Sequence, residues 1–224
     1  TAAFSYSNIC QGAPVMFNDN STIQQGNINQ WSWNFGDNTP GSFLQNPTHI
    51  YANAGTYTVS LTITSNQGCV ATTTSVVTVN AKPNVNFTAA NGCLNAPTIF
   101  NNSSSISGGA ITSWMWDVDG NGIIDYNTAN ISHTYANAGT YTVILNASSN
   151  ANCINSYSTT LTVHPLPLIN ISGNNACHNS VTNFTNSSTI GNNNTITSYN
   201  WNFGNNTNTN QTSPQVIYSA PGNY

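Results

Sequence analysis

The chain has 224 residues and very little charge: 3% of its residues are charged, Lys82 is the sole cation, and the formal net charge is −4. Because so few cations are available to neutralise phosphates, nucleic acid and anionic membrane surfaces are excluded as partners. No apolar run is long enough to insert into a membrane, while 38% hydrophobic and 10% aromatic residues provide for packed cores.

Several markers recur at intervals of about 84 residues. They are the tyrosines Tyr51, Tyr135 and Tyr218, the tryptophans Trp33, Trp116 and Trp201, and the cysteines Cys10, Cys93 and Cys177. Such a period fits a small self-contained domain. Prolines interrupt the pattern at 82–83 and 164–167, so we predict repeats over residues 1–81, 82–165 and 166–224, the third incomplete.

Each repeat has the pattern of a β-domain. In residues 57–64 apolar and hydroxyl side chains alternate, which predicts a half-buried strand with Tyr57, Val59, Leu61 and Ile63 facing inward. The same pattern returns at 141–145, and the closing strands fall near 77–79 and 161–163. Short strands separated by Asn-, Gly- and Ser-rich turns predict an immunoglobulin-like β-sandwich of about seven strands per repeat.

These residues carry a resemblance to the PKD domain family. The segments 33–37 (WNFGD) and 51–59 (YANAGTYTV) resemble the paired motifs of that family, and residues 116–120, 135–143 and 201–205 resemble them again. The resemblance implies a non-enzymatic module of secreted bacterial or archaeal proteins. Such repeats occur in large surface adhesins and beside the catalytic domains of secreted hydrolases.

The motif residues are interpreted as framework. Each tryptophan of the motif would fill the space between two sheets. Gly55 and Gly139 would form the corner before a strand, and Tyr57 and Tyr141 would hydrogen bond back to the main chain.

Cysteine spacing suggests disulfides. Cys10 and Cys69 are 59 residues apart, and Cys93 and Cys153 are 60 apart, so we predict one bond within each repeat, with Cys177 left over. A metal site or buried free thiols are the alternatives. Stable disulfides would place the protein in an oxidising compartment, extracellular or at the cell surface.

The histidines are weak catalytic candidates. His49 and His133 share one repeat position, and the third repeat has Val216 there, which favours packing over chemistry. Because no nucleophile, base and acid recur together, we predict that the chain is not an enzyme and needs no catalytic cofactor.

Residues 117–125 hold the best candidate for a metal site. Asp117, Asp119, Asn121 and Asp125 would offer side-chain oxygens and Ile123 its carbonyl, as in part of an EF-hand loop. Position 12 of such a loop is Thr128 instead of a glutamate. The sequence therefore suggests Ca²⁺ in the second repeat, with a polar turn as the alternative.

Two functions fit these features. The first is a structural or adhesive array, part of a stalk, fibre or adhesin, whose partners are neighbouring repeats, further copies, or polysaccharide and protein surfaces. The alternative is an accessory substrate-binding or spacer module of a secreted hydrolase, which flat, exposed rings at Trp31, Trp114 and Tyr199 would favour.

The third repeat has no counterpart of the strand at 57–63. A sandwich without that strand exposes apolar faces and open edges. We therefore expect either that the polypeptide continues or that a neighbouring molecule supplies the strands.

Overall fold

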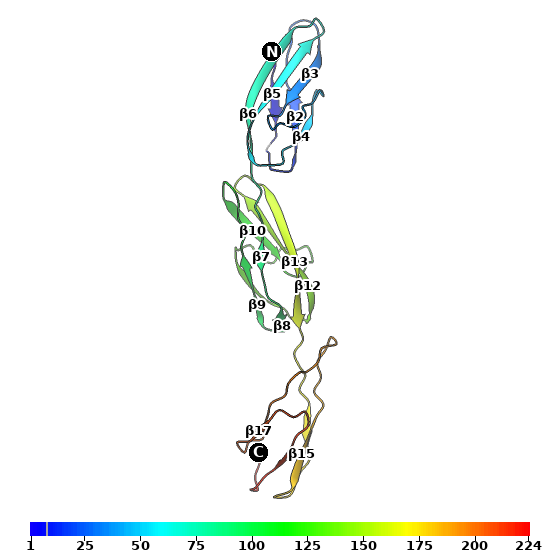
Figure 1. Ribbon diagram of the computed structural model, residues 1–224, viewed down its shortest axis with the longest axis vertical. Coiled ribbons are helices and arrows are strands. Elements are labelled where there is room, and N and C mark those ends of the chain that lie inside the picture. The colour runs from blue at the N-terminus through cyan, green and yellow to red at the C-terminus, as the bar shows by residue number, and fades with distance from the viewer. Residues whose placement is uncertain (8) are drawn as a thin grey trace. The chain divides into compact units, whose positions relative to one another are not determined.

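The alternating residues form strands in a computed structural model that describes residues 1–7 and 9–224 (Figure 1). The secondary-structure elements of this described part are all strands, which confirms the all-β prediction. The chain forms two compact units. One consists of Thr1–Ala89, Ile99–Ile131 and Thr142–Thr160, and the other of Ala90–Thr98, Ser132–Tyr141 and Leu161–Tyr224. The described residues include no helix able to cross a membrane.

Two three-stranded sheets form the part of the first unit that precedes residue 80. One sheet has the order β1 (Phe4–Tyr6), β2 (Pro14–Asp19) and β4 (Thr48–Ile50), and the other has the order β3 (Ile28–Asn34), β5 (Gly55–Ser65) and β6 (Val70–Val79). Phe17 of β2, Trp33 of β3 and Leu61 of β5 belong to the same buried cluster. The sheets therefore enclose a shared core, as expected for a sandwich.

Strand β5 is the centre of its sheet, because it pairs with β3 on one side and β6 on the other. Val59 and Leu61 are 0% exposed and Ile63 is 5% exposed, while Tyr57 is half-buried against the same core. The inward-facing set that alternation predicted is therefore confirmed.

The following residues repeat this design. Within the first unit, β7 (Phe87–Thr88) pairs with β9 (Pro97–Asn102), and β10 (Ile111–Asp117) pairs with β12 (Gly139–Ser149). Trp116 lies opposite Leu145 across the latter pair, and both are fully buried. Strand β11 (Ile131–Thr134) and the long β13 (Ile154–His164) complete the set. The residues of β13 from Leu161 onward belong to the second unit, where Val163 and His164 pair in parallel with β8 (Gly92–Cys93).

The last 59 residues carry shorter strands. Strands β14 (Ile171–Gly173), β15 (Val181–Asn186) and β18 (Gln215–Ile217) form one sheet, and β16 (Trp201–Asn202) pairs with β17 (Asn208–Thr209). Trp201 is half-buried, whereas Trp33 and Trp116 are at most 2% exposed. Residues 167–201 line a groove of about 270 Å³ beside this ring. The same tryptophan position is therefore less well covered here.

One glycine permits a close approach between segments of the first repeat. Gly36 has φ +78°, and a Cβ there would lie 2.4 Å from the Thr58 carbonyl oxygen on the central strand β5. Gly68 has a similar φ of +81° but nothing within 4 Å of the same position. Both sites favour glycine by conformation, but only Gly36 also needs the space.

We predict that Gly36→Ala lowers the free energy of unfolding by about 3 kcal/mol or more, because the methyl group displaces β5 backbone in addition to the conformational strain. Gly68→Ala, the matched control, should cost only about 1–2 kcal/mol for the left-handed conformation. Urea unfolding followed by tryptophan fluorescence measures both. Equal losses would show that the contact with Thr58 is unimportant.

Candidate functional site

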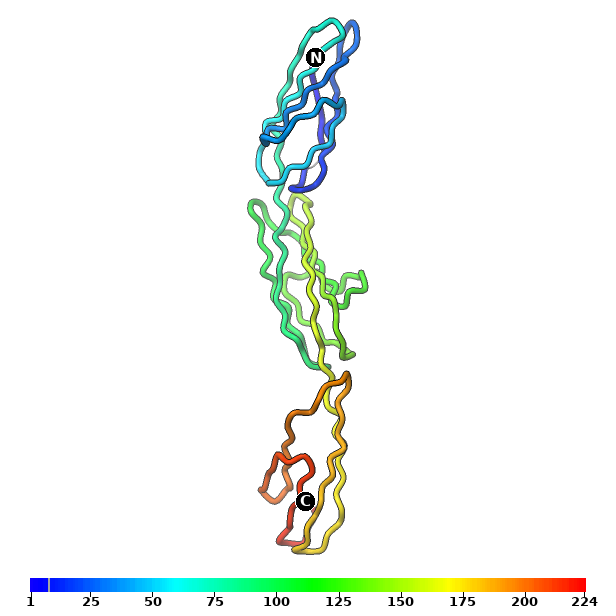
Figure 2. Tube along the Cα trace, turned by 45° about the vertical axis from the view of Figure 1, so that its right-hand side comes forward, coloured from blue at the N-terminus to red at the C-terminus, as the bar shows by residue number. Residues whose placement is uncertain are grey.

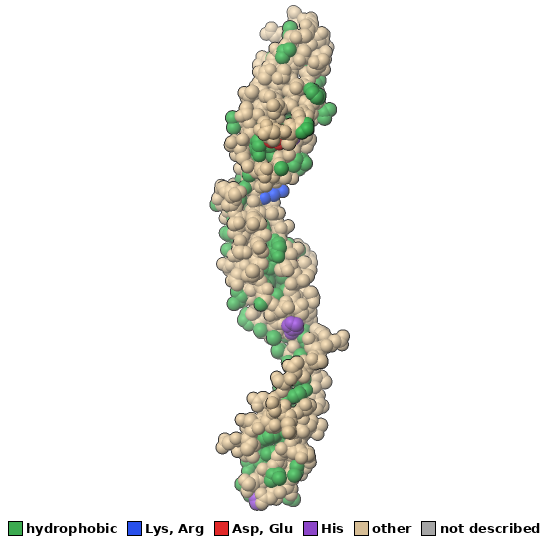
Figure 3. All heavy atoms as spheres, in the orientation of Figure 1, with side chains coloured by type: hydrophobic (Ala, Val, Ile, Leu, Met, Phe, Trp, Pro, Cys, Tyr) green, Lys and Arg blue, Asp and Glu red, His purple; other side chains and the backbone are tan. Residues whose placement is uncertain are grey.

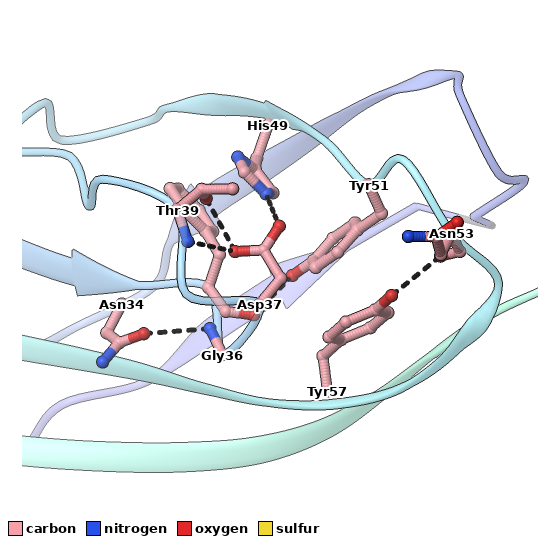
Figure 4. Close-up of polar contacts among 9 residues, drawn as sticks. Asn34, Gly36, Asp37, Thr39, His49, Tyr51, Asn53 and Tyr57 are labelled. Carbon is pink, nitrogen blue, oxygen red and sulfur yellow. Dashed lines mark hydrogen bonds and ion pairs between the residues drawn. The ribbon is translucent and has the colours of Figure 1, made fainter.

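The WNFGD motif forms a polar cluster around Asp37 (Figure 4). One carboxylate oxygen, Oδ1, accepts hydrogen bonds from the Thr39 amide at 3.2 Å and the Thr39 hydroxyl at 2.6 Å. The other, Oδ2, lies 2.7 Å from Nε2 of His49. The His49 ring stacks on Phe35 with centroids 4.0 Å apart. Asp37 therefore ties the motif to β4, which carries His49.

Hydrogen bonding controls the charge on Asp37. Partial burial raises the pKa of this carboxyl group, but the bonds from Thr39 and His49 outweigh that effect and hold the pKa below its usual range. Asp37 is thus an anion at neutral pH. Thr39 and His49 both bind the carboxylate and are not bonded to one another, so the histidine is not placed to activate the hydroxyl group.

The third repeat keeps this turn without the acid or the histidine. Asn205 Oδ1 accepts hydrogen bonds from the Thr207 amide and hydroxyl groups, as Asp37 does from Thr39. Val216 of β18 occupies the position of His49. Because the same turn forms with Asn205 in place of Asp37 and Val216 in place of His49, we interpret these residues as structural.

The tyrosines bond to the main chain, as predicted. The hydroxyl group of Tyr57 donates to the Asn53 carbonyl at 2.8 Å, and that of Tyr141 donates to the Asn137 carbonyl at 2.8 Å. A second bond was not anticipated: the fully buried Tyr51 donates its hydroxyl to the Phe35 carbonyl at 3.1 Å. Burial raises the pKa of Tyr51, which keeps this donor protonated.

Asp117 ends β10, and residues 118–125 lie in the connection from β10 to β11, seen in green in the tube drawing (Figure 2). The two carboxylate oxygens of Asp117 accept hydrogen bonds from the amides of Gly120 at 2.7 Å and Gly122 at 2.8 Å. Asp125 Oδ2 accepts from the Val118 amide at 2.8 Å. Asp119 Oδ1 accepts from the Asn121 amide at 3.2 Å. Backbone donors within the loop therefore bond to all three of its acids.

Asp117 is the buried member of this set, at 2% exposure. Burial raises the pKa of its carboxyl group, but the backbone amides of Gly122, Gly120, Asp119 and Asn121 outweigh that effect and leave the pKa below its usual range. The backbone amides thus keep the carboxylate stable as an anion.

The loop also brings metal-ligand atoms together. Carboxylate oxygens of Asp117, Asp119 and Asp125 lie within 4.8 Å of one another. Asn121 Oδ1 accepts the Ile123 amide at 2.7 Å, so Asn121 and Ile123 belong to the same turn. The Thr128 carbonyl accepts the indole N–H of Trp116 at 2.9 Å. The donor set suits a hard cation such as Ca²⁺, and the same atoms also build the polar turn that was the alternative.

The structure corrects the cysteine pairing. Cys10 is bonded to Cys153, with Cα atoms 5.6 Å apart and a sequence separation of 143. Cys69, Cys93 and Cys177 are free and exposed. The predicted bonds Cys10–Cys69 and Cys93–Cys153 are therefore wrong, and the bond that forms joins the first repeat to the second.

Strand length explains this correction. Cys10 lies beside Asn80, one residue past the end of β6, whereas Cys69 immediately precedes the first residue of β6. Ten strand residues at about 3.3 Å each separate these ends by roughly 33 Å. A disulfide requires Cα atoms less than about 7 Å apart. The constant spacing of cysteines in the sequence reported the repeat period and not the pairing.

Comparison with known proteins identifies the family. A family model described as "PKD domain" matches residues 1–79, 80–165 and 164–224. The chain belongs to the PKD domain family. Two solved PKD domains show the likeness: the PKD1 domain of Vibrio anguillarum Epp has 32% identity, and the PKD1 domain of the Vibrio cholerae metalloprotease PrtV has 35%. The matches cover 36% and 35% of this chain and 93% of each of those chains, with TM-scores of 0.33 and 0.32.

Two collagenases are similar to part of the chain. Collagenase ColA of Bacillus cereus is 37% identical over 78 residues, and a microbial collagenase of Vibrio alginolyticus is 38% identical over 71 residues. The matches cover 35% and 31% of this chain but only 8% and 9% of those proteins. The likeness therefore concerns one PKD-sized segment of each collagenase.

The outer aromatic rings of these PKD repeats are not flat, open platforms. Trp31, Trp114 and Tyr199 are all half-buried, and the indole N–H of Trp31 donates to Asp19 at 2.6 Å. The view in Figure 3 shows a face made mostly of backbone and uncharged, non-hydrophobic side chains, with scattered hydrophobic side chains. The rings that would favour an accessory substrate-binding module are thus partly engaged in packing.

We predict that Asp117→Asn lowers the free energy of unfolding by about 1–3 kcal/mol at pH 7, because an amide cannot accept bonds from Gly120 and Gly122 at both positions. The depressed pKa of Asp117 means that its contribution is present above the unfolded-state pKa of about 4 and is lost as pH falls through the folded-state value. The gap between wild type and variant should therefore narrow in acid. Exposed Asp119→Asn is the control, and a gap that is independent of pH in denaturation from pH 7 to 2 would contradict this assignment.

Proposed function

We propose that the chain is a non-catalytic array of PKD repeats in an extracellular protein, where it forms a structural or adhesive segment of a cell-surface stalk, fibre or adhesin. The observation that carries this proposal is the Cys10–Cys153 bond. A covalent bond between successive repeats resists their separation and suits a segment that transmits force. It also requires an oxidising compartment, which supports an extracellular location.

The surface chemistry supports the same role. With 3% charged residues and a single cation, the repeats have little electrostatic self-repulsion. Neighbouring repeats, further copies of the chain, and uncharged polysaccharide or protein surfaces are therefore suitable partners. Asp37 of the WNFGD motif, together with Thr39 and His49, stabilises a turn, which supports a non-catalytic module.

The second candidate is an accessory module of a secreted hydrolase. It is favoured by the two collagenases that share a PKD-sized segment with this chain. Sedimentation of the purified chain with insoluble collagen separates the candidates. A stalk or fibre segment should bind no more than an unrelated protein does, and saturable binding would favour the accessory module over a stalk or fibre.

We also propose that Asp117, Asp119, Asn121, Asp125 and the carbonyl of Ile123 hold Ca²⁺ in the second repeat. Support comes from the carboxylate oxygens of the three acids, which lie within 4.8 Å of one another. Without a bidentate glutamate at position 12, the affinity should lie in the extracellular range of about 10⁻⁴ to 10⁻³ M.

Ca²⁺ at about 1 mM should then stabilise the second repeat by about 0.4–1.4 kcal/mol, and EDTA should reverse this. Asp119→Ala should abolish the response, because Asp119 is exposed and its loss removes a ligand with little damage to the fold. Calorimetry with Mg²⁺ as the control ion measures the effect. An identical melt in Ca²⁺ and EDTA would leave the polar turn as the full description of the loop.

The proposed mechanical role predicts how the chain extends under force. The Cys10–Cys153 bond closes a loop with a sequence separation of 143, and this loop cannot extend while the bond is intact. Complete unfolding in a single-molecule pulling experiment should therefore release roughly 500 Å more contour length after reduction or in Cys153→Ala. Cys69→Ala, which removes a free thiol, should leave the extension unchanged. A contour length that does not respond to reduction would contradict the covalent link.

A further inference from the structure

The five cysteines fall into two structural types. Three of them, which we call start cysteines, open the same kind of turn near the start of a repeat: Cys10, Cys93 and Cys177. Their carbonyl groups accept the amides of Ala13, Ala96 and Ser180 at 3.1, 3.1 and 2.9 Å. The residue two positions further on has positive φ in every case: Gly12 at 70°, Asn95 at 63° and Asn179 at 60°.

Two of the start cysteines, Cys10 and Cys93, also lie beside the end of a long strand. Cys10 forms a parallel bridge with Asn80, just past the end of β6. Cys93 pairs in parallel with His164, the last residue of β13. Each therefore lies at the end of its repeat from which the chain leaves.

The other two, Cys69 and Cys153, we call turn cysteines. They close the turn that precedes the last long strand of a repeat, and their amides donate to Ser65 Oγ at 3.1 Å and Ser149 Oγ at 3.2 Å. The amides of Ser65 and Ser149 donate in return to the Cys69 and Cys153 carbonyls at 2.9 and 3.0 Å. The two turns are equivalent bond for bond.

The disulfide joins one cysteine of each type across successive repeats. Cys10 is the start cysteine of the first repeat, and Cys153 is the turn cysteine of the second. The remaining cysteines are exposed, although a free cysteine is among the most commonly buried residues. Cys69 and Cys93 thus present the same geometry as the bonded pair, without a partner of the opposite type.

We propose that the exposed thiols are half-cystines of the same bond, each made with a cysteine of the unlike type in another PKD repeat. Cys69 then pairs with a start cysteine, and Cys93 and Cys177 pair with turn cysteines. The partner repeat is carried by the same polypeptide or by a second copy, and the chemistry is identical in both cases. This inference rests on the repeat geometry and holds for a stalk or an accessory module alike.

Each bond forms by oxidation of two thiols. A low-molecular-weight disulfide such as oxidised glutathione is the oxidant. One thiolate attacks it and releases one reduced glutathione, and the second protein thiolate then attacks the mixed disulfide and releases the other. The two cysteines lose two protons and two electrons, and the oxidant leaves as two thiols.

The test is disulfide mapping of the protein from its native source, alkylated before any reduction. Cys69 and Cys93 should resist alkylation, and each should be recovered with a cysteine of the unlike type. Cys69→Ser should then expose one start cysteine to alkylation and leave Cys10–Cys153 intact. The matched variant Cys153→Ser should instead expose Cys10.

A free thiol at Cys69 or Cys93, a bond between two cysteines of the same type, or a stable glutathione adduct would overturn the proposal. Denaturing electrophoresis without reductant distinguishes the two sources of the partner. A partner repeat in the same polypeptide gives a single-chain band, whereas a second copy gives multiples that collapse on reduction.

Discussion

The antiparallel hairpin of β5 and β6 fixes the distance between the two ends of the first repeat. Ten consecutive residue pairs hold these strands together, from Gly55 opposite Val79 to Thr64 opposite Val70. The backbone ladder cannot shorten, so Cys69 at one end stays far from Cys10 at the other. A disulfide of Cys10 therefore needs a cysteine from a neighbouring repeat, which is why the observed bond crosses from one repeat to the next.

Because charged residues are scarce, side-chain amides and backbone donors form the hydrogen bonds of the turns. Asn34 Oδ1 accepts the Gly36 amide at 2.9 Å, and Asn202 Oδ1 accepts the Gly204 amide at 2.9 Å in the same turn of the third repeat. The buried Asp117 is likewise held by backbone amides. Such local bonds need no long side chains, so the turns keep their shape while the surface stays nearly uncharged.

The length of the β5–β6 hairpin places the cysteines of the first repeat of this PKD chain at its two ends. Within a repeat, the turns and tyrosine hydrogen bonds that recur along the chain stabilise the fold, as the equivalent bonds of Asp37 and Asn205 illustrate. Between the first and second repeats, a covalent bond adds to the weaker contacts that usually join domains. A stalk and an enzyme accessory segment would both use such a link, and they differ in what the outer surface binds.

The sequence determined the β-class, the repeat period and the inward-facing residues of β5, because alternation and repetition are local properties that a single chain displays directly. It also located the acids of the 117–125 loop and the hydrogen bonds of Tyr57 and Tyr141. It did not determine the disulfide, since equal cysteine spacings in two repeats fit bonds within a repeat as well as bonds between repeats. Only the tertiary structure decided that question, because the length of β6 separates Cys69 from Cys10 and it is Cys153 of the next repeat that lies close enough to bond Cys10.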